Sequence, residues 1–314
     1  MPLRSQEVDL FEASRARLGA IAYRLLGSAG EAEDAVQETF LRWDAADRDL
    51  IEVPEAWLTK VLTNLCLTQL TSARARRETY VGQWLPEPLL EGDPMLGPAD
   101  TVEQRESVSV AVLTLMERLS PNERAVYVLR EAFACRHGEI AEILGVTEAG
   151  SQQTYHRAKR RLADGRARTE VDQTAARKVI DEFLSAATSG DTDALVRLLT
   201  DDAMAVGDGG GKVPARAKPF SGAQAVAKFM RGLFKYSDAK RALLGGPVAL
   251  YVSRVNGAPA LLAVADGRVA GVMSVETVDG RISAFRNVVN PDKLDRIDHR
   301  WRATEHGDPI MGIW

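Results

Sequence analysis

Between residues 137 and 162 the chain carries amide and basic side chains at the spacing of a helix that binds DNA. In the segment HGEIAEILGVTEAGSQQTYHRAKRRL, apolar residues mark a short helix, Gly145 supplies a tight turn, and a second helix starts near Thr147. Glutamine and arginine side chains hydrogen-bond base edges in pairs, and lysine and arginine bind phosphates. The spacing predicts a helix-turn-helix whose second helix enters a major groove. Its candidate DNA-contacting residues are Gln152, Gln153, Tyr155, His156, Lys159 and Arg160.

The elements that would position these side chains are helices. From Val8 to Arg168 most apolar residues recur at three- and four-residue spacing, which is the period of an α-helix. Ser120-Pro121 followed by Glu123 is typical of a helix start, with a serine cap and a proline in the first turn. We therefore expect two further helices before the helix-turn-helix, and together the four helices would make a compact module.

The charge of the chain is divided between surfaces of opposite sign. The formal net charge is −4, from 40 basic and 44 acidic residues, which taken alone argues against a nucleic-acid binder. Residues 31–55, however, carry nine acids and two bases, whereas residues 154–168 carry six bases and one acid. A third, basic cluster comprises Arg74, Arg76 and Arg77. This segregation indicates separate surfaces for separate partners.

The pattern changes character in the middle of the chain. A proline- and glycine-rich stretch at 80–100 predicts a linker. After about residue 172, helical segments at 174–188, 192–199 and 222–236 combine with a glycine-rich extended stretch at 203–215. Apolar runs follow, separated by three residue pairs typical of tight hairpins. These patterns predict three helices and a strongly bent antiparallel sheet, then a loose polar tail. The hairpin pairs are Asn256-Gly257, Asp266-Gly267 and Asp279-Gly280.

Two stretches of the helical half resemble one family. Residues 18–43 and 54–79 resemble the second conserved region of bacterial sigma factors of the extracytoplasmic-function group, and residues 107–162 resemble their fourth region. The resemblance implies a transcription initiation factor that binds core RNA polymerase through the clamp helices of the largest subunit and the flap. Such a factor recognises the −35 and −10 promoter elements and promotes melting of the −10 element.

The resemblance also implies roles for particular residues. The acidic residues at 31–40 are expected to form a helix, and this helix matches the one that docks on the clamp helices. The segment 71–79 matches a loop that captures a flipped −10 base. Trp57 is a further candidate for stacking on a base, although the core is the more common place for a tryptophan. The candidate polymerase-binding residues are Glu33, Asp34, Val36, Gln37 and Phe40, and the candidate −10-binding residues are Asn64, Arg74, Arg76 and Arg77.

The second half resembles the SnoaL-like branch of the NTF2-like fold, an α+β cone with a pocket between sheet and helices. Three short segments resemble motifs of sigma factors that carry a fused SnoaL-like C-terminal domain, the J type. The resemblance implies regulation in cis without a separate anti-sigma factor, and it leaves open a small ligand in the C-terminal pocket. The expected regulatory residues are Trp84, Leu85, Pro86, Glu87, Pro88, Asp208, Gly209, Gly210, Gly211, Lys212, Asn290, Pro291, Asp292, Lys293 and Leu294.

Two other functions remain as alternatives. One is a one-component regulator that uses the helix-turn-helix alone, but the acidic helix and the separate arginines at 74–77 argue against it. The other is a SnoaL-type enzyme, for which Asp208, Tyr236, Asp238 and Tyr251 are candidates by residue type. All four histidines lie outside the domain body, and the sequence has no metal-ligand cluster. We therefore predict no enzyme activity, catalytic residue, metal or cofactor.

The remaining expectations concern location and boundaries. The sequence shows no signal peptide and no apolar stretch long enough for a membrane span. Cys66 and Cys135 read as buried thiols in a reducing compartment, so we expect a cytoplasmic protein with no membrane partner. The fold class is multidomain, with two all-α modules before the α+β cone. The expected parts are 1–79 (region 2), 80–104 (linker), 105–168 (region 4), 172–294 (SnoaL-like domain) and 295–314 (loose tail).

Overall fold

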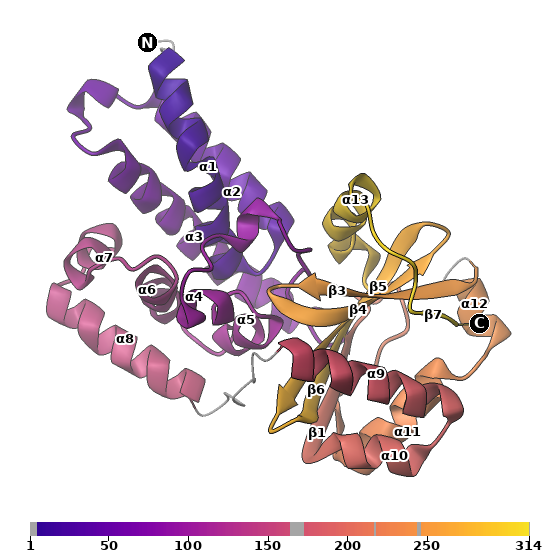
Figure 1. Ribbon diagram of the computed structural model, residues 1–314. Coiled ribbons are helices and arrows are strands. Elements are labelled where there is room, and N and C mark those ends of the chain that lie inside the picture. The colour runs from indigo at the N-terminus through magenta and orange to yellow at the C-terminus, as the bar shows by residue number, and fades with distance from the viewer. Residues whose placement is uncertain (1–4, 164–172, 217, 244–245, 314) are drawn as a thin grey trace. The chain divides into compact units, whose positions relative to one another are not determined.

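The computed structural model describes residues 5–163, 173–216, 218–243 and 246–313. Arg166 and Arg168 of the basic cluster lie outside these ranges. The chain divides into two compact units, one made of residues 1–79 and 92–165 and the other of residues 80–91 and 166–314. The first is helical and the second combines helices with a sheet (Figure 1). The linker is therefore shared, since its first half belongs to the mixed unit.

Three long helices build the first module of the helical unit. They are α1 (Ser5–Leu26), α2 (Ala29–Ala45) and α3 (Pro54–Glu78). Ser28 caps α2 by accepting a hydrogen bond from the Glu31 amide. Apolar side chains from all three helices meet in a closed core, which includes Phe11, Leu18, Ile21, Leu25, Val36, Trp43, Leu58, Leu62 and Cys66. Pro54 begins α3, and Arg48–Leu50 forms a 3-10 turn before it.

The second module has four helices, as the sequence predicts. They are α5 (Val110–Met116), α6 (Pro121–Glu131), α7 (His137–Leu144) and α8 (Glu148–Ala163), and a short helix α4 (Val102–Glu106) precedes them. Ser120 and Glu123 form a reciprocal capping box at the start of α6. Gly145 ends α7 with a left-handed φ of 67°, which a glycine adopts without steric cost.

The mixed unit is built on a seven-stranded sheet with the order β2-β1-β6-β5-β4-β3-β7. The expected hairpins are confirmed, because Asn256, Asp266 and Asp279 all have positive φ and are each followed by a glycine with positive φ. The expectation of a wholly antiparallel sheet is wrong, since β1 pairs with β6 in parallel. The strands are β1 (Leu199–Asp208), β2 (Phe220–Ser221), β3 (Val248–Val255), β4 (Ala258–Ala265), β5 (Arg268–Val278), β6 (Arg281–Val288) and β7 (Met311–Ile313).

The two faces of this sheet are covered by different parts of the chain. Helices cover one face (Figure 1), and their apolar core includes Phe183, Met230 and Phe285. The other face packs against Leu85 and Leu90 of the linker and against Ile297 and Trp301. The helices of the mixed unit are α9 (Gln173–Ser189), α10 (Thr192–Leu198), α11 (Ala223–Phe234), α12 (Asp238–Leu243) and α13 (Asp295–Ala303).

The expectation of a loose tail from residue 295 is wrong. Residues 295–303 form α13, which places Ile297 and Trp301 in the core on the linker side of the sheet. The chain then adds β7 to the edge of the sheet, where Val248 pairs with Ile313. Leu294, Ile297 and Trp301 recur at helical spacing, and the charged residues between them obscure that period in the sequence.

Candidate functional site

The outward face of α8 carries most of the predicted DNA-contacting side chains. Ser151, Ala158 and Leu162 are buried and fix the inward face of the helix. The side chains expected to reach DNA that are exposed together on the outward face are Gln152, Gln153, His156, Lys159 and Arg160. Helix α8 follows a left-handed turn after α7, so the arrangement is that of a helix-turn-helix.

Tyr155 differs from the other candidates on α8 because it is half-buried. Its hydroxyl donates a hydrogen bond to Glu131 of α6, and its ring packs edge-on against His137 at 5.5 Å between centroids. Lys159 lies over the Tyr155 ring, with its Nζ 5.4 Å from the centroid. Tyr155 therefore orients α8 and the Lys159 side chain within the module.

The segment predicted as a base-capturing loop is part of a helix. Helix α3 continues without interruption to Glu78, so the expectation of a loop at 71–79 is wrong. The physical reason is that no glycine or proline lies between residues 55 and 81, and the Ala- and Arg-rich end favours a helix. Asn64 lies exposed on α3. The side chains of Arg74 and Arg76 lie outside what the structure describes.

Arg77 is bound inside the helical unit. Its guanidinium forms an ion pair with Glu117 at the end of α5 and donates to the Leu26 carbonyl at 2.6 Å. Glu117 also accepts a hydrogen bond from Arg124 of α6, and the Arg124 residue is only 1% exposed. One carboxylate therefore joins α3 of the first module to α6 of the second.

A second buried arginine joins the same two modules. Arg24 of α1 is fully buried and donates to the Ser107 hydroxyl at 2.9 Å and to the Leu96 carbonyl at 2.7 Å. Its own carbonyl accepts from Arg124 Nε at 3.2 Å. Burial lowers the pKa of Arg24 to about 10 and that of Arg124 to about 9. The two modules are thus joined by the buried guanidinium groups of Arg24 and Arg124. These groups keep their hydrogen bonds only while the modules stay packed together.

The acidic helix α2 divides its predicted polymerase-binding residues between surface and core. Glu33, Asp34 and Gln37 are exposed together. Val36 is buried, and Phe40 packs edge-on against Phe11 at 4.9 Å between ring centroids. The three polar side chains form a surface that a basic partner fits, while the two apolar ones hold the helix in place.

The three motifs of the second half converge on Asp208. This carboxylate is fully buried at the end of β1 and accepts from Tyr80 Oη at 2.6 Å and from the Leu85 amide at 2.8 Å. Lys293 Nζ lies 2.7 Å from Asp208 Oδ2 and 2.6 Å from the Leu85 carbonyl. Asn290 Nδ2 donates to Tyr80 Oη at 2.9 Å. We call these five residues, Tyr80, Leu85, Asp208, Asn290 and Lys293, the linker clamp.

Aromatic rings and glycines complete the linker clamp. Lys293 Nζ lies 4.2 Å from the centroid of the Trp84 ring, which is half-buried. The Gly210 amide donates to Asp208 at 3.1 Å, so the glycine loop wraps a carboxylate of its own chain. A Cβ on Gly210, whose φ is 60°, would lie 2.3 Å from Asn290. The loop therefore requires glycine at this position for its close approach to Asn290.

The far end of the linker segment is fixed to strand β3. The Leu89 amide donates to Asn256 Oδ1 at 2.9 Å, and the Asn256 amide donates to the Leu89 carbonyl at 2.9 Å. Leu90 forms an antiparallel bridge with Val255, and Arg254 forms an ion pair with Glu91 at 2.7 Å. Linker residues 80–91 are thus bound to the mixed unit at both ends.

The candidates for an enzymatic site do not gather in one place, since only Tyr236 and Asp238 contact each other. Asp208 is held in the linker clamp, and Tyr251 packs against Trp301 on the linker side of the sheet. Tyr236 donates to Asp238 at 2.5 Å on the surface. Within the described residues no group of three histidine, cysteine or acidic side chains is arranged to hold a metal ion. Nor does any described helix have the length and apolar character needed to cross a membrane.

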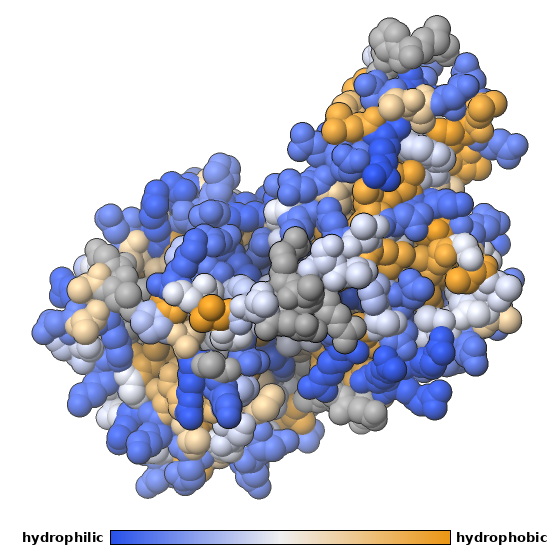
Figure 2. Space-filling model, turned by 180° about the vertical axis from the view of Figure 1, so that it is seen from behind, coloured by the Kyte–Doolittle hydropathy of each residue, from blue (hydrophilic) through white to orange (hydrophobic). Residues whose placement is uncertain are grey.

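Sequence reasoning missed three exposed apolar side chains, one on α2 and two in the connection between α2 and α3. Leu41, Leu50 and Val53 are 54%, 79% and 58% exposed. Seen from behind, apolar surface gathers toward the end of the helical unit where the chain begins (Figure 2). Trp57 packs against Trp43 at 5.6 Å between ring centroids and is half-buried. The sequence signal that could have revealed these side chains is the presence of Leu50 and Val53 in an otherwise polar connection.

Comparison with known families agrees with this geometry. Residues 10–76 match the family described as Sigma-70 region 2, and residues 109–162 match the family described as Sigma-70, region 4. The chain is 36% identical to the ECF RNA polymerase sigma factor SigJ of Mycobacterium tuberculosis over 92% of its own length and 93% of that protein. The chain belongs to the extracytoplasmic-function sigma factors.

Two further comparisons extend the likeness of this sigma factor over nearly its whole length. It is 33% identical to the probable ECF sigma factor SigI of the same species, over 91% of this chain and 93% of that protein. The crystal structure of Mycobacterium tuberculosis SigJ matches with a TM-score of 0.68 and 34% identity, over 91% of this chain and 97% of that one. Sigma factors are transcription initiation factors that bind core RNA polymerase and promoter DNA. The C-terminal domain of this one combines helices with a mixed sheet.

Proposed function

We propose that this sigma factor reads the −35 element with the outward face of α8 and the −10 element with residues of α3 and the exposed connection before it. We further propose that its C-terminal domain regulates initiation in cis by holding the linker between the two modules. The observation that carries the proposal is the linker clamp, in which a buried ion pair fixes residues 80–91 to the C-terminal domain.

The packing of the two modules supports a need for regulation. A domain of about 150 residues has a diameter of about 40 Å, from a radius of gyration of about 15 Å. The centres of two elements named −35 and −10 are separated by about 85 Å along B-DNA, at 3.4 Å per base pair. Modules joined through Glu117 in a single unit do not reach both elements at once. The factor must therefore unpack before it engages a promoter.

The linker determines how far the unpacked modules separate. Residues 79–101 have an extended reach of about 80 Å if they are free. With residues 80–91 bound at Asp208 and at β3, the first half becomes a spacer of fixed length. The C-terminal domain thus converts a flexible tether into a defined one, and control of the two modules requires no separate anti-sigma factor.

Surface chemistry supports the partners we assign. The exposed Glu33, Asp34 and Gln37 would bind a basic surface of core polymerase, and the α2–α3 connection offers apolar side chains against which an unstacked base packs. The C-terminal domain would act as a regulatory module and not as an enzyme, which the separation of Asp208, Tyr236 and Tyr251 supports.

Transcription at promoters of different spacer length tests the proposal. The promoter would be recovered by sequencing DNA bound in cells, and its −35 to −10 spacing then varied by single base pairs. Wild-type holoenzyme should work within a narrow range of spacings. The double variant Tyr80→Phe with Trp84→Ala, which weakens only the linker side of the clamp, should broaden that range. Val81→Ala, an exposed position in the same segment, is the matched control.

Deletion provides a second arm of the same experiment. Removal of residues 175–314 should change both the level and the spacing range of transcription, and removal of residues 305–314 alone should act differently because the linker clamp remains. Identical spacing profiles for the wild type, the clamp variant and both truncations would overturn cis regulation. They would leave the reading of the two elements standing.

A further inference from the structure

Helix α11 of the C-terminal domain carries a row of basic side chains on the face turned away from the domain core. Lys228 and Arg231 lie on the helix, Lys235 follows its last residue, and all three are exposed. Their intervals of three and four residues place them on one side of the helix. We call these three residues the α11 row. The side chains on the opposite side, which pack into the apolar core of the domain, are Val226, Ala227, Met230 and Phe234.

The α11 row forms no ion pair with a residue that the structure describes. Its surroundings in the sequence are strongly basic, since residues 212–241 contain eight basic residues and one acidic residue, Asp238. Arg231 donates to the Thr192 hydroxyl at 3.3 Å, and this neutral partner leaves its charge in place. Asp191, beside Thr192, caps the start of α10 instead. An uncompensated row of cations indicates a partner with several negative charges.

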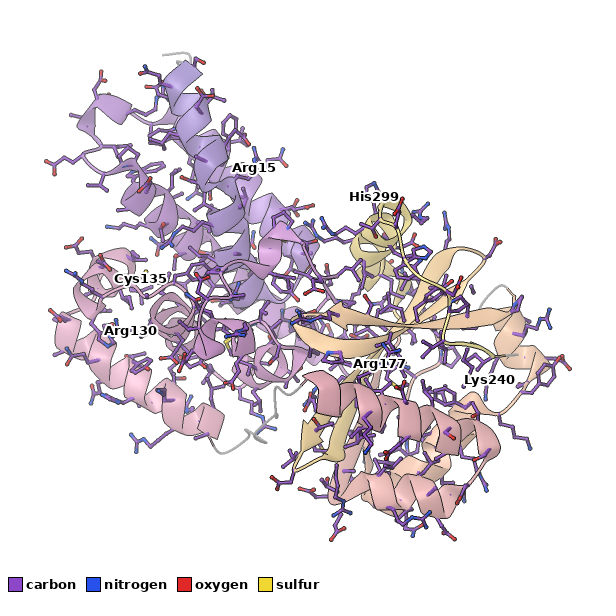
Figure 3. The ribbon with its side chains drawn as sticks, viewed as in Figure 1. Arg15, Arg130, Cys135, Arg177, Lys240 and His299 are labelled. Atoms are coloured by element: carbon purple, nitrogen blue, oxygen red, sulfur yellow. The ribbon has the colours of Figure 1, made fainter. Side chains whose placement is uncertain are left out.

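The α11 row is held on a fixed support. Lys240 of α12 donates through its Nζ to the carbonyls of Leu233 and Lys235 at the end of α11, at 3.2 and 3.0 Å (Figure 3). In the middle of the helix, the Phe229 ring stacks on Phe220 of β2 with 4.2 Å between centroids. Cations on a fixed backbone lose less freedom on binding, so the row suits a partner whose charges are themselves regularly spaced.

The length of the α11 row matches the spacing of phosphates in duplex DNA. From Lys228 to Lys235 the helix advances about 10 Å, at 1.5 Å per residue. Along about 10 Å of B-DNA, one strand presents about three phosphates, at 3.4 Å each. The chain belongs to a family that binds promoter DNA, so duplex DNA is the polyanion of its working complex.

We propose that the α11 row binds phosphates of promoter DNA, which gives the C-terminal domain a DNA contact of its own beside those of α8 and α3. Lysine and arginine contacts to phosphates position a protein on the duplex without reading its sequence. The contact therefore adds affinity for any DNA that lies against α11. It depends neither on the linker clamp nor on which residues read the −35 and −10 elements.

The salt dependence of promoter binding measures this contact. The double variant Lys228→Gln with Lys235→Gln removes two charges and keeps Arg231, which also contacts α10. Each phosphate contact contributes about 0.9 to the slope of log affinity against log salt concentration. With holoenzyme on the promoter recovered from cells, we expect a slope smaller by about 2 and at least tenfold weaker binding at low salt. An unchanged slope would overturn the proposal.

Two controls separate this contact from an effect of net charge and from binding to polymerase. Arg177→Gln with Lys178→Gln makes the same charge change on α9, where both side chains already pair with acids, and should leave the slope as in the wild type. The Lys228→Gln, Lys235→Gln protein should bind core polymerase without DNA as the wild type does. Equal loss of slope in both double variants would make net charge the cause. Weaker binding to core polymerase would make an acidic protein surface the partner, and either result would overturn the proposal.

Cleavage of DNA from a position on α11 tests the contact directly. Gln224 is exposed four residues before Lys228, on the same side of the helix. Both native cysteines are buried, so Gln224→Cys can be labelled with an iron chelate that cleaves DNA through hydroxyl radicals. After assembly with core polymerase, the labelled protein should cut the promoter at a defined place. Glu305→Cys, exposed after α13 on the other face of the sheet, should not. Absence of cleavage from position 224, or equal cleavage from both positions, would contradict the proposal.

Discussion

Lys293 Nζ lies 2.7 Å from Asp208 Oδ2, and both side chains are less than a tenth exposed. The same ammonium donates to the Leu85 carbonyl at 2.6 Å, so one cation joins the linker to the strand end that carries Asp208. A buried ion pair costs desolvation and is stabilising only when further hydrogen bonds satisfy both groups. Tyr80, Leu85 and Gly210 supply those hydrogen bonds to Asp208.

Removal of Lys293 should destabilise the C-terminal domain strongly. In Lys293→Met, Asp208 stays buried without its cation, and we expect a loss of about 3–5 kcal/mol in the free energy of unfolding. Urea denaturation followed by circular dichroism measures the loss. Limited proteolysis should show cleavage within residues 80–91 at denaturant concentrations where the wild type is protected.

The neighbouring ion pair Lys212–Asp292 provides the control for this prediction. Its atoms lie 2.6 Å apart, but its side chains are 56% and 62% exposed. Lys212→Met should therefore change the free energy of unfolding by no more than about 1 kcal/mol. If the two variants lost stability equally, burial of the clamp would not be the source of its strength.

The Tyr80 hydroxyl should make the linker clamp sensitive to alkali. Burial, and then the hydrogen bond to Asp208, raise the pKa of Tyr80 above its ordinary value near 10. A group whose pKa is raised by folding stabilises the fold fully below its unfolded pKa and loses that contribution as pH rises through the folded value. We expect the linker of the wild type to become more susceptible to cleavage above about pH 10.

Tyr80→Phe isolates this contribution. The variant should be less stable than the wild type at neutral pH, by about 1–3 kcal/mol, because Asp208 and Asn290 each lose a partner. The difference in stability between the two proteins should shrink as pH rises beyond 10. If the stability difference between the two proteins stayed constant through the alkaline range, ionisation of Tyr80 would not weaken the linker clamp.

Local patterns in the sequence were sufficient for much of the fold. The helix-turn-helix follows from apolar spacing and Gly145, and the hairpins follow from Asn-Gly and Asp-Gly pairs, whose backbone preferences are intrinsic. The parallel pairing of β1 with β6 was missed because its partners lie about 80 residues apart and no local pattern specifies them. The burial of Lys293 was missed for the same reason, since it depends on Asp208.

The resemblance to a known family was enough to predict which motifs belong to the candidate site. It was not enough to predict contacts that depend on how distant parts of the chain pack together. The three motifs of the second half do converge, although neither Tyr80 of the linker nor Asn256 stood out as a residue that would hold the linker to the C-terminal domain. Arg77 has the residue type of a phosphate contact, but the structure pairs it with Glu117, which lies 40 positions away.

Arg130 donates to the Cys135 carbonyl at 3.0 Å, a contact that closes the turn before α7 (Figure 3).

Weakening the contact between the two helical modules should increase transcription. Glu117→Gln removes the charge that Arg77 and Arg124 share, and the nearly fully buried Arg124 then lacks a carboxylate. We expect a loss of about 3–5 kcal/mol in the stability of the helical unit by urea denaturation. At limiting core polymerase, the level of transcription should rise because less packing opposes separation of the modules.

Glu103→Gln is the control for this variant, because Glu103 is exposed in the first turn of α4. It should alter neither stability nor transcription by a measurable amount. A Glu117→Gln protein that is destabilised but transcribes at the wild-type level would mean that the packed modules do not limit initiation.

Charge reversal on α2 should weaken binding to core polymerase. Glu33→Lys with Asp34→Lys inverts the exposed acidic surface without touching Val36 or Phe40. We expect at least tenfold weaker binding at low salt, with the difference falling as ionic strength rises, because exposed charges are screened. Asp181→Lys with Glu182→Lys on α9 makes the same charge change on the C-terminal domain and should bind as the wild type does. If both double variants weakened polymerase binding equally, the cause would be the change in net charge and not the loss of the acidic surface on α2.

The basic side chains at the end of α8 should fall into two classes in binding to −35 DNA. Lys159 and Arg160 are exposed on the outward face, whereas Arg161 forms an ion pair with Glu123 of the α6 capping box at 2.6 Å. In holoenzyme, Lys159→Ala and Arg160→Ala should each weaken binding and reduce the salt slope by about 1, as expected for one lost phosphate contact. Arg161→Ala should leave the slope unchanged and lower the stability of the module by no more than about 1 kcal/mol, because its guanidinium is exposed. Arg177→Ala on α9 controls for loss of a positive charge. A salt slope reduced as much by Arg161→Ala as by Arg160→Ala would place Arg161 on the DNA and remove the distinction that its pairing with Glu123 implies.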